Sequence, residues 1–186
     1  MKHLIELYAE KLGLPQAVIE RAKEIELKLL TSIKIDAVSA VAASIMIASR
    51  ELGYPISALA IGKALGKTQH FVLNAYKKAC KALGIKLPPP DTIKILTTAA
   101  EKLKLPPDTV ELAKKLCLLA KDKIANGRDP YAVAAACIWI ADYITRGNSG
   151  VSQKTLAQTI GTSIITIRKR AKEILELMNY TLNEVK

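Results

Sequence analysis

The amino-acid sequence predicts an all-α fold, a tandem duplication of a five-helix unit that ends in a helix–turn–helix. Three observations support this prediction. The chain of 186 residues is 50% hydrophobic but only 4% aromatic, and alanine and leucine, which favour helices over strands, are abundant. No segment shows the alternation of polar and apolar residues between turn signals that marks a half-buried strand. The third observation is that the sequence repeats itself after about ninety residues.

Three pairs of segments carry the repeat. AEKLGLPQAVIERAK at 9–23 matches AEKLKLPPDTVELAK at 100–114 at nine of fifteen positions. The shift is 91 here, 93 between 36–49 and 129–142, and 95 between 56–72 and 151–167. The joint GIKLPPPD carries three prolines, which cannot continue a helix. We therefore expect a first repeat at 1–84, a proline-rich linker at 85–90 and a second repeat at 91–186.

Apolar periodicity predicts five helices in each repeat. We expect them near 3–12, 16–32, 36–51, 57–64 and 68–84, and near 91–104, 107–126, 129–146, 152–160 and 163–179. Pro15 and Pro106 stand just ahead of the second helices, where proline is compatible with a helix start. Asp36 and Asp129 precede the third helices as N-caps.

The last two helices of each repeat are expected to form a helix–turn–helix. Ser57 and Ser152 precede the fourth helices as N-caps, and Gly66 and Gly161 end them, because glycine adopts the positive φ of a helix C-cap. In the second repeat the fifth helix has two candidate N-caps. These are Thr162 and Ser163.

The third helices are expected to be central and nearly free of solvent. Their uncharged runs, AVSAVAASIMIAS at 37–49 and PYAVAAACIWIA at 130–141, are shorter than the ~18 residues that a membrane span needs. A helix that is apolar all round lies inside a domain. Met46 and Trp139 are therefore assigned to the core. Cys80, Cys117 and Cys137 lack metal-ligand spacing and are expected to be buried thiols of a reducing compartment.

The positive charge is segregated along the chain. The formal net charge is +11, yet residues 52–90 hold six lysines and no acid. Residues 143–172 hold Arg146, Lys154, Arg168, Lys169, Arg170 and Lys172, again without an acid. Segregated charge of this kind indicates two surfaces for a polyanion.

The fifth helix of the second repeat has the pattern of a DNA-recognition helix. On a helical wheel Ile165, Arg168, Lys169 and Lys172 share one face. An apolar contact for a thymine methyl, a donor fork for guanine and cations for phosphates are the groups that major-groove recognition uses. The alternative is a solvated basic helix end. In NGRDPYAVAAA at 126–136, Arg128 just before the helix is either a phosphate contact or an ordinary solvated arginine.

No pattern indicates catalysis or a metal site. IGKALGKT at 61–68 has one residue too few between its glycines for a phosphate-binding loop, and no strand precedes it. His3 and His70 stand alone, without carboxylate or cysteine neighbours at ligand spacing. We therefore expect a protein that is not an enzyme and has no cofactor and no metal.

These residues resemble a known family. A duplicated five-helix repeat with GRDPYAVAAACIWIA and QKTLAQTIGTSIITIRKRAKEI in its second unit is similar to the cyclin-fold core of archaeal transcription factor B and eukaryotic TFIIB. The resemblance implies two cyclin-like domains that bind TATA-binding protein and promoter DNA, with RNA polymerase as a further partner. It also implies that the second helix–turn–helix enters the major groove at the element beside the TATA box.

The resemblance also assigns residues. Ile165 and Arg168 match the base-contacting positions, and Arg128 matches the phosphate-contacting Gly-Arg loop. The DNA-facing set expected from charge and resemblance together is Lys67, Thr68, Gln69, Lys77, Arg128, Lys154, Ile165, Thr166, Arg168, Lys169 and Lys172. The first repeat lacks the Gly-Arg pair and has Leu73 and Asn74 where the family often carries Gly-Arg. The family's N-terminal zinc ribbon has no counterpart in this sequence, as expected of a core fragment or a ribbon-less paralogue.

We therefore expect a monomeric promoter-recognition factor without a membrane segment, located in the cytoplasm of an archaeal cell at the nucleoid, or in the nucleus of a eukaryotic one. The main alternative is a cyclin-like protein-interaction module or regulatory paralogue that does not read DNA sequence. A helix–turn–helix repressor is a third possibility, but it would require a symmetric dimer and a palindromic site. The internal duplication favours a monomer with two unequal DNA-binding surfaces.

Overall fold

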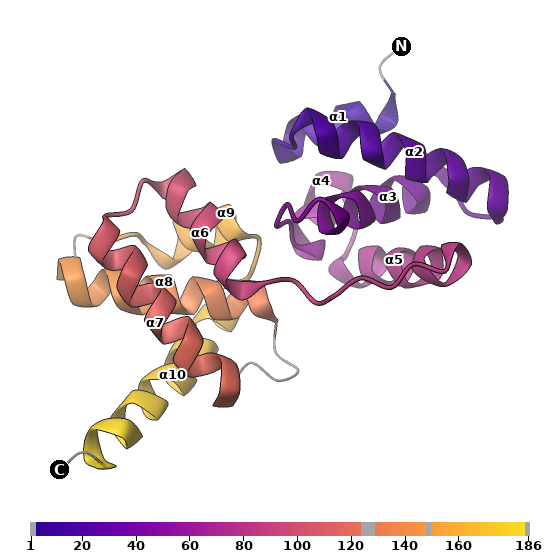
Figure 1. Cartoon of the computed structure of the whole chain (residues 1–186). Coiled ribbons are helices and arrows are strands. Elements are labelled where there is room, and N and C mark those ends of the chain that lie inside the picture. Colours follow the sequence, from indigo (N-terminus) through magenta and orange to yellow (C-terminus); the bar gives the residue numbers. More distant parts are fainter. Residues whose placement is uncertain (1–2, 124–128, 148–149, 185–186) are drawn as a thin grey trace. The chain divides into compact units, whose positions relative to one another are not determined.

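The computed structural model describes residues 3–123, 129–147 and 150–184, in which ten α-helices and no strand occur. The chain divides into two compact units, residues 1–90 and 91–186. Figure 1 shows the ten helices in chain order, five in each unit. The predicted all-α duplication of a five-helix unit is thereby confirmed.

The first unit contains α1 (Leu4–Leu12), α2 (Gln16–Ser32), α3 (Ala37–Glu51), α4 (Ala58–Leu65) and α5 (Gln69–Leu83). The second contains α6 (Thr92–Leu103), α7 (Pro107–Lys123), α8 (Pro130–Arg146), α9 (Gln153–Ile160) and α10 (Ile164–Glu184). The largest departure from the expected helix bounds is the C-terminal end of α10, which runs five residues past 179. No glycine or proline follows Gly161, so no residue in this stretch interrupts the helix.

The predicted caps are confirmed. Asp36 accepts a hydrogen bond from the backbone N–H of Ser39, and Ser57 accepts one from that of Ala60. Asp129 and Ser152 cap α8 and α9 in the same way. Each of these side chains satisfies a backbone donor that the first turn of a helix leaves without a partner. The local sequence signals therefore set where these four helices begin.

A central helix organises each unit. α3 contacts each of the other four helices of the first unit, and α8 does the same in the second. All residues from 40 to 49 of α3 are buried, and so are 131–138 and 140–142 of α8. The predicted burial is confirmed for these residues. It is wrong for the start of α3, where Ala37 is exposed, and for the end of α8, where Tyr143 and Ile144 are 56% and 54% exposed.

The aromatic and sulfur side chains follow the core prediction in part. Met46 is buried, whereas Trp139 is only partly buried and stacks on Tyr143 with 6.2 Å between ring centroids. Cys117 and Cys137 are buried, as expected, and the neighbouring Cys117 together with burial raises the pKa of the Cys137 thiol. Cys80 is only half-buried, so the expectation of a buried thiol is wrong at this position.

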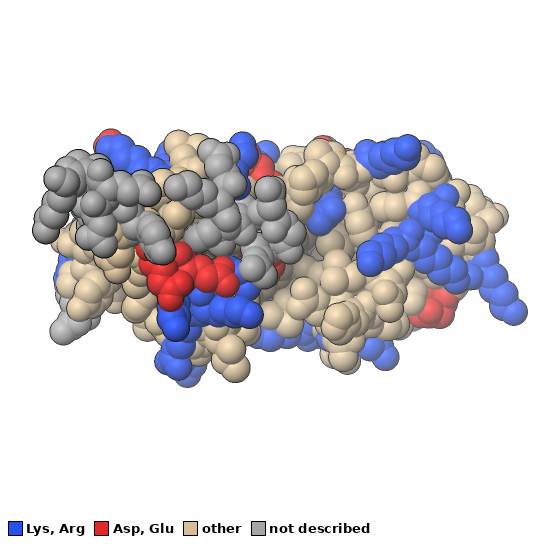
Figure 2. Space-filling view, turned by 90° about the horizontal axis from the view of Figure 1, so that it is seen from below, with Lys and Arg blue, Asp and Glu red and all other residues tan. Residues whose placement is uncertain are grey.

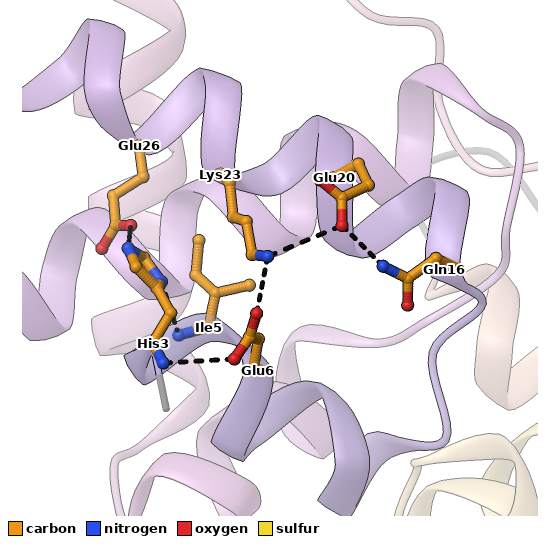
Figure 3. Close-up of polar contacts among 7 residues, drawn as sticks. All are labelled: His3, Ile5, Glu6, Gln16, Glu20, Lys23 and Glu26. Carbon is orange, nitrogen blue, oxygen red and sulfur yellow. Dashed lines mark hydrogen bonds and ion pairs between the residues drawn. The ribbon is translucent and has the colours of Figure 1, made fainter. Parts of the chain in front are cut away.

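A polar network joins α1 to α2 in the first unit (Figure 3). The Nζ atom of Lys23 lies 2.6 Å from Glu6 Oε1, and the Nε2 atom of His3 lies 3.2 Å from Glu26 Oε2. The Nδ1 atom of His3 accepts from the backbone N–H of Ile5, so this histidine also caps α1. Glu26 is only 6% exposed, and its burial raises its pKa while His3 opposes the rise.

The approach of α4 to the turn that follows it yields a first prediction, for Gly62→Ala. A Cβ atom at Gly62 would lie 2.7 Å from the Lys67 carbonyl oxygen, whose residue donates its own N–H to Gly62. Alanine in place of an interior helical glycine ordinarily stabilises by about 1 kcal/mol, but this contact should reverse the sign. We expect a net loss of about 1–3 kcal/mol in the free energy of unfolding, measured by urea denaturation. A variant more stable than the parent chain would contradict the close packing.

The buried carboxyl of Glu26 yields a prediction about pH. Because the folded state raises the pKa of Glu26 above its ordinary value of 4.5, folding binds the proton more tightly, and this contribution to stability is lost as pH rises through the raised pKa. Glu26→Gln should therefore gain stability over the parent chain as pH increases from about 4 to about 8. Urea unfolding at several pH values measures the difference, and a difference independent of pH would contradict the prediction.

Candidate nucleic-acid interface

Three local features form the turn between α9 and α10 in the second unit. Gly161 ends α9 with a φ of 77°, and the backbone N–H of Thr162 donates to the carbonyl of Ala157 over 3.1 Å. The Ser163 side chain then accepts from the backbone N–H of Thr166 over 3.1 Å, and the two hydroxyls lie 2.6 Å apart. Ser163 is therefore the N-cap of α10, whereas Thr162 is buried beneath the turn.

The two faces of α10 differ in chemistry. Ile167, Ala171 and Ile174 are buried in the core of the second unit. On the opposite side Ile165 is 80% exposed, and Arg168, Lys169 and Lys172 are exposed with it. The side chains that the helical wheel placed on one face thus lie outside the core. Ile165 therefore places one exposed apolar side chain among three exposed cations.

Arg168 is held by a residue of the neighbouring helix. Its Nε atom donates to the side-chain oxygen of Gln153, the first residue of α9, over 2.8 Å. Within the described residues its guanidinium makes no other polar contact. Both terminal nitrogens of the guanidinium therefore keep their N–H groups available to a ligand.

Arg170 does not belong to this face, which corrects its place in the acid-free window. It is 7% exposed and forms an ion pair with Glu173. Burial raises the pKa of the Asp129 carboxyl. Backbone hydrogen bonds and the positive charge of Arg170 oppose this rise. The helical period of 3.6 residues turns position 170 inward although 168, 169 and 172 point outward.

Arg146 is likewise not a free cation. Its Nε and Nη2 atoms each lie 2.6 Å from Oδ1 of Asp142, a carboxylate that is 1% exposed. The second oxygen of Asp142 accepts from the backbone N–H of Val151, just before α9. Asp142 therefore ties the end of α8 to the segment that leads into the helix–turn–helix.

The remaining cations of the stretch 143–172 are exposed. Lys154 and Lys169 have no ion-pair partner in the part of the chain that the structure describes. Lys172 lies 3.8 Å from Glu176, but both side chains are well exposed, at 79% and 61%, so water screens the pair and it is worth little. These three lysines surround Ile165 and Arg168 in sequence, and all three can meet a phosphate backbone.

The first unit presents a corresponding but different surface. In Figure 2, Lys and Arg side chains spread over the face of this unit that is in view, and acidic side chains are few. Thr68 caps α5 by accepting from the N–H of Phe71, and the Lys67 ammonium lies 5.5 Å from the centre of the Phe71 ring. Gln69 and Lys77 are exposed. All four predicted residues of this unit therefore lie at its surface, on α5 or just before it.

The repeat register shows what this surface lacks. With the shift of 95, the positions of Ile165 and Arg168 are held by His70 and Leu73. His70 is exposed, while Leu73 packs against the core of the first unit. The first unit therefore has exposed cations without an arginine at the place where the second unit carries one.

Three further expectations concern Arg128, a metal site and a membrane segment. Arg128, assigned to a phosphate contact, lies outside the described residues. Across 3–121, 129–147 and 150–179, where side chains are described, no group of His, Cys, Asp or Glu is arranged to hold a metal ion. None of the helices in the described chain has the length and apolar character that crossing a bilayer requires.

Gln153 is a site residue that the sequence analysis missed. It follows a serine N-cap and looks like an ordinary first-turn residue. The signal lies in comparing the repeats, since Gln153 corresponds to Ala58 and Arg168 to Leu73. Both polar residues are present in one unit and both are replaced in the other.

Known proteins match this chain along most of its length. The model of the transcription factor TFIIB repeat matches residues 85–177, half of the chain. A transcription initiation factor IIB of Ignicoccus hospitalis is 33% identical over 177 residues, which cover 92% of this chain and 55% of the relative. Those of Aeropyrum pernix and Thermoplasma acidophilum are 31% and 29% identical, covering 94% of this chain in each case and 56% and 57% of the relatives.

The chain spans little more than half the length of these curated relatives. Within that span the similarity runs through both units, because more than nine-tenths of the chain is aligned. The family match covers the whole segment from the linker through the first two thirds of α10, including the helix–turn–helix. Fold, duplication and sequence similarity agree, and the chain belongs to the transcription factor TFIIB repeat family.

Proposed function

We propose that this chain is the core of a general transcription initiation factor that binds a complex of TATA-binding protein and promoter DNA. In this proposal the helix–turn–helix of the second unit reads the element that flanks the TATA box. The observation that carries the proposal is the face of α10, where an 80%-exposed Ile165 stands beside Arg168. Ile165 is the most exposed of the large apolar side chains in the described part of the chain, and its place beside Arg168 distinguishes this face from a purely cationic helix end.

The chemistry of that face suits the major groove. Arginine pairs bidentately with guanine, and a small apolar side chain contacts the thymine methyl group. Lys154 of α9 and Lys169 and Lys172 of α10 are exposed. They are assigned to phosphates, which give affinity and register without carrying sequence information. The short Thr166 side chain, bonded to Ser163, leaves the N-terminal turn of α10 open to close approach.

The first unit supplies a second, less specific contact. Its exposed cations around α4 and α5, together with Lys67, Thr68, Gln69 and Lys77, are assigned to the phosphate backbone. Without an arginine at the position of Leu73, this surface has no fork for a base edge. One chain with two unequal DNA surfaces can bind an asymmetric site as a monomer, whereas a palindromic site calls for a symmetric dimer.

The relatives support the proposal at the level of their names. Each relative described above is a transcription initiation factor IIB, and this chain is similar to them throughout both units. We assign RNA polymerase as a further partner and no catalytic activity or cofactor. The competing proposal is a protein-interaction module that binds its partners without contacting DNA bases, and the salt and base dependence of binding separate the two.

Binding to promoter DNA should depend steeply on salt. Arg146 and Arg170 are engaged within the protein, so we assign about five or six phosphate contacts to the remaining exposed cations, which gives a slope of log affinity against log salt of about −5. A mobility shift with a TATA promoter duplex, with and without TATA-binding protein, measures it across salt concentrations. A slope near zero for binding to the preassembled complex would exclude the cations from the interface and favour the protein-interaction module.

Arg168 and Lys172 should differ in kind. Arg168→Ala should cost about 1–3 kcal/mol on the preferred element and flatten the discrimination between elements. Lys172→Ala should weaken binding to all sequences alike and reduce the salt slope by at most about one, because Glu176 already lies close to Lys172. Competition binding against duplexes varied upstream of the TATA box measures both variants. Equal losses across the panel for Arg168→Ala would leave it a phosphate contact and remove base reading.

A further inference from the structure

A side-chain hydrogen bond joins the two helices of the second-unit helix–turn–helix. The donor is Arg168 Nε in α10 and the acceptor is Gln153 Oε1 in α9, at 2.8 Å and fifteen residues apart in sequence. Arg168 is exposed and Gln153 is partly buried. The partly buried Gln153 side chain therefore restrains the exposed Arg168 side chain.

Gln153 has no evident role within its own helix. The N-cap of α9 is Ser152, whose hydroxyl accepts from the N–H of Thr155 over 3.1 Å. In the described chain the amide group of Gln153 has no polar contact other than Arg168. The Gln153 side chain therefore restrains Arg168 and does not cap α9.

The bond decides which edge of the guanidinium faces outward. Arginine can present a two-pronged fork either through Nε and one Nη or through both Nη atoms. Gln153 occupies Nε, so the pair of Nη groups is the fork that stays available. A long flexible side chain held at Nε also loses fewer conformations when the fork meets a base.

The first unit provides an internal comparison. The positions of Gln153 and Arg168 are held there by Ala58 and Leu73. Ala58 is 5% exposed, and Leu73 packs against the same core. An apolar pair thus stands where the second unit has a polar pair, so acceptor and donor are present or absent together.

We propose that Gln153 is a positioning residue for sequence recognition: it holds Arg168 so that its two Nη groups form an end-on fork for guanine. This inference rests on the proposed function, because it assigns the device that directs the reading side chain. Gln153 itself contacts no base. It sets the base preference of Arg168 and leaves the affinity for the phosphate backbone to the lysines.

The test measures base discrimination by the full chain on promoter duplexes preassembled with TATA-binding protein. Each duplex differs at one base pair upstream of the TATA box. The variants are Gln153→Leu, Gln153→Glu, Arg168→Ala and the double variant Gln153→Leu/Arg168→Ala. Gln158→Leu is the matched control, because Gln158 is an exposed glutamine of the same helix without a polar contact in the described residues. Circular dichroism and thermal melting verify that each variant is folded.

We expect Gln153→Leu to reduce discrimination about two- to tenfold at the base pair that Arg168 reads, the range that one hydrogen bond commands. The salt slope should stay unchanged. Gln153→Glu keeps an acceptor for Nε, so it should preserve discrimination while its charge weakens binding to all duplexes alike. Gln158→Leu should change neither quantity. In the double variant the loss of discrimination should equal that of Arg168→Ala alone.

Three results would overturn the inference, and they differ in what they leave standing. Full discrimination by Gln153→Leu, where Arg168→Ala has lost it, would remove the positioning role and keep base reading by Arg168. An additional loss in the double variant would mean that Gln153 contacts DNA directly. Unchanged discrimination by Arg168→Ala at every base pair would remove base reading from the proposed function, and the role of Gln153 with it.

Discussion

Each unit of this protein depends on one central helix that is buried along most of its length. α3 and α8 touch all four companions in their units, and four neighbours can approach one helix closely only where its side chains are small. The alanine-rich runs of both helices meet this condition. Burial of apolar surface around them is the main source of stability, and close packing gives the surrounding helices little freedom to shift.

That shared core leaves the outer surfaces free to differ. In both units the fourth helix ends at a glycine in the left-handed region and the fifth begins at a hydroxyl N-cap. The same two-helix corner therefore carries His70 and Leu73 in one unit and Ile165 and Arg168 in the other. Duplication preserved the scaffold, while the residues at these two positions diverged. This divergence is the physical basis for the two unequal DNA surfaces that we propose.

The charge of the protein is less available than its sequence suggests. Arg146 is held by the almost fully buried Asp142, and Arg170 by Glu173. Both arginines lie in the stretch 143–172, which holds no acid. Their partners Asp142 and Glu173 are the residues that directly flank it. An arginine held inside the fold at a carboxylate supports the structure around it, since removing one partner leaves the other charge desolvated. Within the described residues of 143–172, the exposed cations that we propose for a polyanion are Lys154, Arg168, Lys169 and Lys172.

The sequence by itself determined the all-α class, the duplication and the helix starts, because composition, repeated register and capping are local properties. It also determined the face of Ile165, Arg168, Lys169 and Lys172, since the helical period alone sets it. Only the tertiary structure decided that Ser163 rather than Thr162 caps α10, and that Asp142 of α8 accepts from the backbone N–H of Val151 just before α9. It alone revealed the bond between Gln153 and Arg168. These depend on how one helix packs against another, and no local pattern encodes which side chains that packing brings within hydrogen-bond distance.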